Sequence, residues 1–404
     1  MLVNVFQWIA VLAIAFVAGK LMNKIKMPSI LGWLIAGMLL GPHAINLMPH
    51  DVLESSWYKT IIIWMQCSFG VMLGSELVWR KLKSSGKSLI ITTLTQSLGT
   101  FAIVSLAFGI VFYITNIPVY LAFVFGGIAL ATAPAPALSI VNEFHTKGPV
   151  TDALIPMTIL DDIVGIAVFF TVNSLIARMA SSGSIPLYMI PVMIFLPVVI
   201  GIIVGFPAGF ILKKCRKKTS NLIVILCGIT ATMLIGWIIN RYLPFGITLN
   251  YMLMGVSFSA VFSNMITTEQ LENANNYFAP ILGISLLAAI VDLGAPLDYH
   301  LILGAGMYTL IYITTRAFGK YFGSRIGAKV THMPDTVKNY LGLTLLPHSG
   351  VSLVFTGIIC STLSSAPELV KIVQGTIAAA AVINEFIAVI AAKKGFELAD
   401  EIRQ

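Results

Sequence analysis

Apolar segments of about 20 residues follow one another along almost the whole chain. A helix needs about 20 mostly apolar residues to cross a bilayer, and thirteen such segments can be placed in the sequence. Their approximate ranges are 2–22, 28–47, 57–79, 88–115, 118–142, 150–177, 187–212, 220–240, 246–265, 276–296, 299–329, 337–363 and 367–392. This pattern predicts an all-α, polytopic membrane protein with 13 transmembrane helices and no soluble domain.

The charge content excludes the main soluble classes. Asp, Glu, Lys and Arg make up only 10% of the 404 residues, whereas soluble domains contain about 25%. So few charges cannot cover the surface of a soluble enzyme, a nucleic-acid binder or a disordered chain. The four cysteines show no metal-binding spacing. We therefore expect no resident metal, no cofactor and no enzymatic activity.

The basic residues set the expected orientation. Lys and Arg mark cytoplasmic loops, and alternate loops here hold twenty of them while the other loops hold four. This asymmetry predicts an N-terminus outside the cell and a C-terminus in the cytoplasm. It also explains the net charge of +8, because the basic residues serve as topology markers.

Two of the expected spans are interrupted by prolines. Pro134 and Pro136 fall inside the fifth span, and Pro347, followed by Gly350, falls inside the twelfth. A proline removes a backbone donor and clashes with the preceding turn, and unpaired backbone at membrane depth is tolerated only against protein or a water-filled cavity. The two broken spans are seven spans apart. Because successive spans alternate in direction, these two cross the bilayer in opposite directions. Broken helices in inverted halves indicate a transporter's substrate site.

Charged side chains near the middle of a span are expensive and indicate function. Asp161 and Asp162 lie near the middle of the sixth span, and Arg316 near the middle of the eleventh. Neighbouring residues of a helix point about 100° apart, so one carboxylate can pair with Arg316 while the other faces a cavity. Burial and a like-charged neighbour both favour the protonated form of a carboxyl group, so one oxygen site can hold either H⁺ or a cation.

Oxygen ligands suit hard cations such as Na⁺. Thr132, Ser139 and the carbonyl groups freed by Pro134 and Pro136 are positioned in the sequence to complete such a shell. Competition between H⁺ and a small cation for one carboxylate is the physical basis of exchange.

Four segments, in the right order, resemble the monovalent cation/proton antiporter superfamily. Met27–Pro42 is similar to its opening motif, and Leu160–Ile166 to its paired-aspartate helix. The stretch from Arg316 to Ala328 resembles the helix with the basic partner, and Leu346–Val351 the second unwound helix. The branch with the greatest similarity is the bacterial NapA-type sodium/proton antiporter with paired aspartates.

The resemblance implies an NhaA/NapA-like antiporter fold, with inverted repeats and two crossing broken helices. It implies a moving core domain, near 57–177 and 299–392, and a dimerisation domain, near 1–47 and 187–265, joined by a linking helix at 276–296. It also implies a homodimer in the lipid of the bacterial inner membrane.

The resemblance assigns roles to the charged residues. Asp162 would bind Na⁺ or the proton, and Asp161 would form a salt bridge with Arg316. Relatives of this branch often have Lys where Arg316 is placed, and a buried arginine does not release its proton, which favours one proton per cation. His348 stands where relatives often have Gln, so it is a candidate for pH sensing.

These residues favour exchange of Na⁺ or Li⁺ for H⁺. The alternatives are a K⁺/H⁺ antiporter of the same superfamily, a solute symporter of similar architecture, and an intramembrane aspartyl protease. The protease is the weakest, because its two aspartates face each other from separate helices, whereas Asp161 and Asp162 are adjacent.

Overall fold

The structure, a computed structural model, consists of α-helices in the part of the chain that it describes. That part is residues 2–24, 29–80, 86–132, 141, 145–180, 186, 189–215, 217–243, 249–295, 306–348 and 350–402. The helices are α1 (Leu2–Lys24), α2 (Ser29–Leu40), α3 (His50–Leu53), α4 (Ser56–Glu76), α6 (Gly86–Ile114), α7 (Leu121–Ile128), α9 (Pro149–Ala180), α10 (Met189–Lys214), α11 (Lys218–Tyr242), α12 (Tyr251–Met265), α13 (Thr268–Gly294), α15 (Gly306–Val330), α16 (Asp335–Thr344), α17 (Gly350–Thr362) and α18 (Pro367–Leu398).

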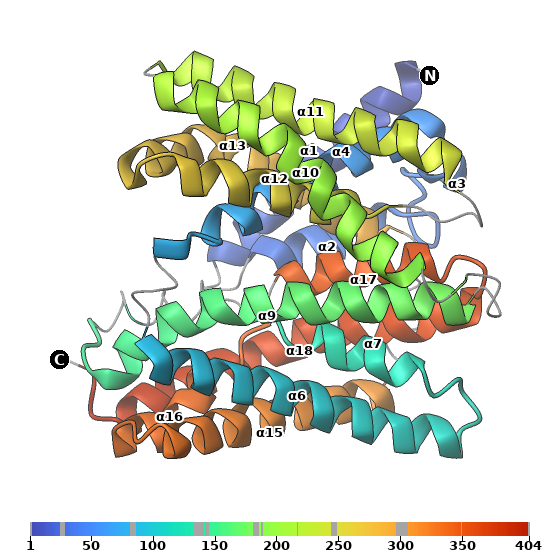
Figure 1. Cartoon of the computed structure of the whole chain (residues 1–404). Coiled ribbons are helices and arrows are strands. Elements are labelled where there is room, and N and C mark those ends of the chain that lie inside the picture. Colours follow the sequence, from blue (N-terminus) through green and yellow to red (C-terminus); the bar gives the residue numbers. More distant parts are fainter. Residues whose placement is uncertain are drawn as a thin grey trace.

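The helices form two groups that lie on opposite sides of the molecule (Figure 1). The first, which we call the scaffold group, contains α1, α2, α4 and α10–α13; the second, the core group, contains α6, α7, α9 and α15–α18. The groups meet where α13 contacts α17, where α10 contacts α9 and where α2 contacts α18. Helix α4 packs on α12 and α13 and therefore lies in the scaffold group.

The long helices have the length and surface of membrane spans. Within the described residues, six helices are long and apolar enough to cross a bilayer, and the bent helix α18 makes a seventh. The exposed face of α10 is apolar, with Phe195, Ile203 and Phe210 each at least 60% exposed. Every expected span overlaps a helix, and the twelfth overlaps two, α16 and α17, while the count of thirteen stays a prediction.

Glycines let α15 approach α6 at backbone distance. Gly319, Gly323 and Gly327 lie one turn apart, and all three face α6. A Cβ atom at Gly323 would lie 2.7 Å from the Cα of Gln96. Small residues allow this close packing between membrane helices. It brings Lys320 of α15 and Gln96 of α6 to the same place.

Replacing Gly323 with alanine is expected to push α15 away from α6. We expect a loss of about 1–3 kcal/mol in the free energy of unfolding, as overpacking typically costs, and slower ion exchange. The measurement is thermal unfolding in detergent. Gly283→Ala is the matched control, because a Cβ there meets no atom within 4 Å. Equal melting temperatures for the two variants would contradict the prediction.

Candidate functional site

Two non-helical segments, each following the end of a helix, cross at the centre of the core group. Helix α7 ends at Ile128, and the next residues are not helical up to Thr132. Helix α16 ends at Thr344 and α17 begins at Gly350. Thr132 and His348 form an isolated antiparallel β-bridge where the two extended segments meet. The break predicted in the twelfth span is therefore present, with Pro347 in the non-helical segment. In the fifth span α7 ends before Pro134, and the predicted break itself falls outside the described residues.

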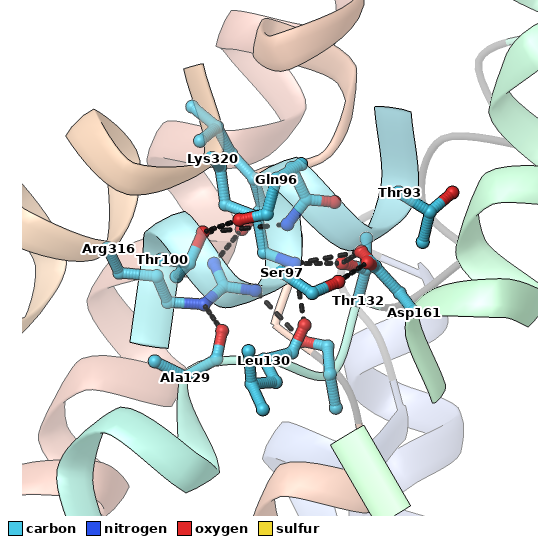
Figure 2. Close-up of polar contacts among 12 residues, drawn as sticks. Thr93, Gln96, Ser97, Thr100, Ala129, Leu130, Thr132, Asp161, Arg316 and Lys320 are labelled. Carbon is cyan, nitrogen blue, oxygen red and sulfur yellow. Dashed lines mark hydrogen bonds and ion pairs between the residues drawn. The ribbon is translucent and has the colours of Figure 1, made fainter. Parts of the chain in front are cut away.

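Arg316 joins these two unwound segments. It is 1% exposed and donates to the carbonyl oxygens of Ala129 and Ala131 on one segment, at 3.1 and 3.0 Å. It also donates to the carbonyl oxygens of Leu346 and Pro347 on the other, at 2.5 and 3.2 Å. The carbonyl ends of helices carry partial negative charge, so the guanidinium both satisfies and neutralises these groups. Figure 2 shows Arg316 against Ala129.

The Asp161 carboxylate is buried and surrounded by donors (Figure 2). The Lys320 ammonium forms an ion pair with Oδ2 at 2.8 Å, and the Thr132 hydroxyl donates to the same oxygen at 2.7 Å. The Ser97 hydroxyl donates to Oδ1 at 2.5 Å. With its amide nitrogen turned to the carboxylate, Gln96 donates to both oxygens at 2.8 and 2.9 Å. These contacts stabilise Asp161 as a charged structural partner.

Asp162 lies in a different environment, although it is the next residue. Its side chain is 8% exposed, and its Oδ1 atom has no hydrogen-bond partner within the described part of the chain. The backbone N–H of Thr132 donates a hydrogen bond to this carboxyl group, and the negative charges of Asp161 and Glu76 repel its charged form. A buried oxygen without a partner is costly, and a proton or a cation would satisfy it.

The ion pair with Asp161 is made by Lys320 rather than by the expected Arg316. The two residues lie one helical turn apart on α15, so both face the crossing, but Arg316 is directed to the four carbonyl groups. Lys320 reaches Asp161 because the close contact of α15 with α6 places Lys320, and not Arg316, next to this carboxylate. A stoichiometry of one proton per cation is therefore no longer favoured, since that expectation required an arginine in this position.

The other expected site residues have mixed outcomes. His348 is buried, and its Nε2 atom lies 3.2 Å from the hydroxyl oxygen of Tyr312; a role in pH sensing stays a prediction. Ser139, Pro134 and Pro136 lie outside the described residues. No group of three His, Cys, Asp or Glu side chains suited to a metal occurs among the residues described.

Three residues that hold Asp161 are not predicted from the sequence. Lys320 stands in the sequence as a charge toward the inner end of its span, and Gln96 and Ser97 carry no charge that would single them out. A usable signal is nevertheless present, because Thr93, Gln96, Ser97 and Thr100 place polar groups on one side of an otherwise apolar helix.

Comparisons with known proteins show which family the chain belongs to. A family model described as "Sodium/hydrogen exchanger, transmembrane" matches residues 11–393. The chain belongs to this family of sodium/hydrogen exchangers. This membership makes it a multi-pass membrane transporter for cation/proton antiport and not an enzyme, which removes the protease alternative.

The fold of this exchanger is also that of solved antiporters. A structure of the sodium proton antiporter MjNhaP1 from Methanocaldococcus jannaschii at pH 8 is similar with a TM-score of 0.76 and 19% identity, over 99% of both chains. A second structure of MjNhaP1, from an electron-microscopy map, gives a TM-score of 0.64 and 19% identity over 98% of both chains. A search of curated proteins by sequence found no match.

Proposed function

We propose that this exchanger moves Na⁺ or Li⁺ against H⁺, with Asp162 as the group that binds either ion. The observation that carries the proposal is the contrast between adjacent carboxylates. Asp161 has its donors in place, including Lys320, whereas Asp162 has a buried oxygen without a partner in the described part of the chain. Protonation or cation binding at Asp162 each supplies the missing positive charge, and the two exclude each other.

The cation shell at Asp162 is proposed from the nearby oxygen atoms. Thr132 supplies a hydroxyl oxygen, although this hydroxyl is already bonded to Asp161 and Lys320. We keep Ser139 as a further candidate ligand, on the strength of its position in the sequence. Oxygen ligands of this kind suit alkali cations as transported substrates.

We further propose that the core group moves against the scaffold group to expose Asp162 to each side in turn. The sparse contacts between the groups support this division. The proposal differs from the sequence-based boundaries in two elements. Helix α4 packs on α12 and α13 and is assigned to the scaffold. Helix α13, expected as the linking helix, packs on α2 and α4 and is assigned to the scaffold as well. The proposed homodimer, the N-out orientation and the bacterial inner membrane rest on the family resemblance and the charge pattern.

Purified protein in liposomes with an internal pH-sensitive dye tests the transported ion. After a pH gradient is set, we expect Na⁺ and Li⁺ to dissipate it and K⁺ to have little effect. A response to K⁺ alone would replace the proposal with K⁺/H⁺ exchange. No response to any of the three cations, with an intact gradient and correctly inserted protein, would refute alkali-cation exchange.

A further inference from the structure

The N-terminus of α9 is capped by a side chain that follows the last helix, α18. The first residue of α9, Pro149, has no N–H group, and the first amide bonded within the helix is that of Asp152, which donates to Gly148. The amides of Val150 and Thr151 instead donate to the two carboxylate oxygens of Glu401, at 2.7 and 2.9 Å. Unpaired amides at a helix start need such an acceptor.

Glu401 is held in this position by its own contacts. Its side chain is 3% exposed, and it accepts a third hydrogen bond from the Thr151 hydroxyl at 2.7 Å. Its backbone carbonyl accepts from the amide of Lys147 at 3.0 Å. A carboxylate at a helix N-terminus is also favoured by the helix dipole. The contact is therefore a built clamp and not a solvated surface charge.

The end of α18 aims Glu401 at α9. The amides of Asp400 and Glu401 donate to the carbonyl groups of Glu397 and Phe396, and Asp400 has a positive φ of 58°. This is the pattern of a Schellman motif, in which a left-handed residue reverses the chain after a helix. Asp is one of the few residues besides glycine that adopt this conformation, so the turn is compatible with the sequence, and it places Glu401 directly against the start of α9.

The same helix α18 also contacts the crossing. The Asn384 amide donates to the carbonyl oxygen of Leu346 in the unwound segment at 2.8 Å. Helix α18 thus touches the crossing at one point and the start of α9 at another. Val150 and Leu154 of α9 and Phe396 of α18 belong to one buried hydrophobic cluster.

Asp161 and Asp162 lie on α9 about 16 Å along the helix axis from the clamp, at 1.5 Å per residue. Pro156 lies on α9 between the clamp and the two aspartates. It lacks the N–H that would donate to the carbonyl oxygen of Asp152, so α9 has one backbone hydrogen bond fewer there. The first turns of α9 therefore depend on outside contacts for their position. Of these contacts, Glu401 provides the charged one.

We propose that Glu401 is a positioning residue for exchange: it anchors the start of α9 and thereby fixes Asp161 and Asp162 relative to the crossing. The proposal rests on the proposed function of Asp162. Without the contact of Glu401, α9 can shift. The hydrogen bonds and the ion pair of Asp161 then lengthen, and the Asp162 site binds the cation more weakly.

Two variants remove the clamp in different ways. Glu401→Gln keeps the shape but places an amide nitrogen against donors. Gly148→Ala keeps the charge, but its Cβ would lie 2.5 Å from the carboxyl carbon of Glu401 and displace it. Glu397→Gln is the matched control, because its carboxylate lies one turn earlier on α18 and pairs with Lys394 at the surface, at 3.1 Å.

In the liposome assay we expect each clamp variant to raise the apparent KM for Na⁺ about fivefold, the size of effect typical for a lost helix cap, with a smaller change in maximal rate. The KM of the double variant Gly148→Ala/Glu401→Gln should be close to that of the more affected single variant, because both substitutions disrupt the same contact of Glu401 with α9. The control should match the wild type. Wild-type KM in both clamp variants would overturn the proposal.

Hydrogen exchange measured by mass spectrometry in detergent provides a readout without transport. We expect faster exchange in both clamp variants over 149–155 and also over 157–165, which includes the aspartates. Faster exchange confined to 149–155, together with an unchanged KM, would mean that Glu401 only caps the helix. If the wild type exchanges no alkali cation, the proposed function fails, while the hydrogen-exchange result still decides whether Glu401 positions α9.

Discussion

Asp162→Asn is expected to abolish cation-driven proton movement without unfolding the protein. Asparagine has nearly the same shape as aspartate, but it neither releases a proton nor neutralises a bound cation. In the proposed cation-bound state the buried pair is the cation with the Asp162 carboxylate. Removing one partner of such a pair costs about 3–5 kcal/mol, and every 1.4 kcal/mol is a factor of ten. We therefore expect exchange to fall by at least about 100-fold on this basis.

Stability should respond in the opposite sense to activity. The Oδ1 atom of Asp162 has no hydrogen-bond partner in the described residues, and the group is repelled by Asp161 and Glu76. Neutralising it removes that repulsion, so the melting temperature in detergent should stay the same or rise. The measurements are dye-reported exchange in liposomes and thermal unfolding of the same preparation.

Asp152→Asn is the matched control for this experiment. Asp152 lies on the same helix and is exposed to solvent. We expect wild-type exchange from this variant. Exchange at the wild-type rate by Asp162→Asn would remove the central assignment of the proposed function, whatever the control shows.

Lys320→Gln is expected to be the most destabilising single change at the site. The Lys320 ammonium is fully buried and donates to Asp161, to the Thr132 hydroxyl and to the carbonyl oxygen of Leu130. Glutamine leaves Asp161 as a buried carboxylate without its ion pair. Breaking a buried pair in this way typically costs about 3–5 kcal/mol, so we expect a clearly lower melting temperature and loss of exchange.

A double-variant cycle separates this effect from general damage. In Asp161→Asn/Lys320→Gln no unpaired charge remains, so the double variant should be more stable than the sum of the two single losses predicts. Lys338→Gln is the control, because Lys338 pairs with the exposed Asp335 at 2.9 Å and surface pairs contribute little. Strictly additive losses, or a wild-type melting temperature for Lys320→Gln, would contradict the assigned ion pair.

The site residues that can be predicted from the sequence are those whose physical cost is visible in one dimension. Charges and prolines inside apolar segments are expensive in lipid wherever the neighbours lie. Asp161, Asp162, Arg316 and Pro347 can therefore be identified as site residues from the sequence alone. The all-helical membrane fold follows in the same way from the lengths of the apolar segments.

Pairings between distant segments required the tertiary structure. Lys320 and Arg316 lie one turn apart with the same charge, and only the glycine-mediated contact of α15 with α6 decides which of them reaches Asp161. The polar groups of Gln96 and Ser97 are ordinary in a helix sequence until that contact places them on the carboxylate. The clamp by Glu401 joins residues 250 positions apart.

The sequence by itself determined that the chain spans a membrane, and it singled out the prolines and acidic groups inside apolar segments, since both follow from the cost of moving polar groups out of water. Only the tertiary structure decided that Asp161 is held by Lys320 while, among the described residues, Asp162 keeps a buried oxygen without a hydrogen-bond partner. Hydrogen bonds and ion pairs depend on distances of a few ångströms between helices, which the order of residues does not fix.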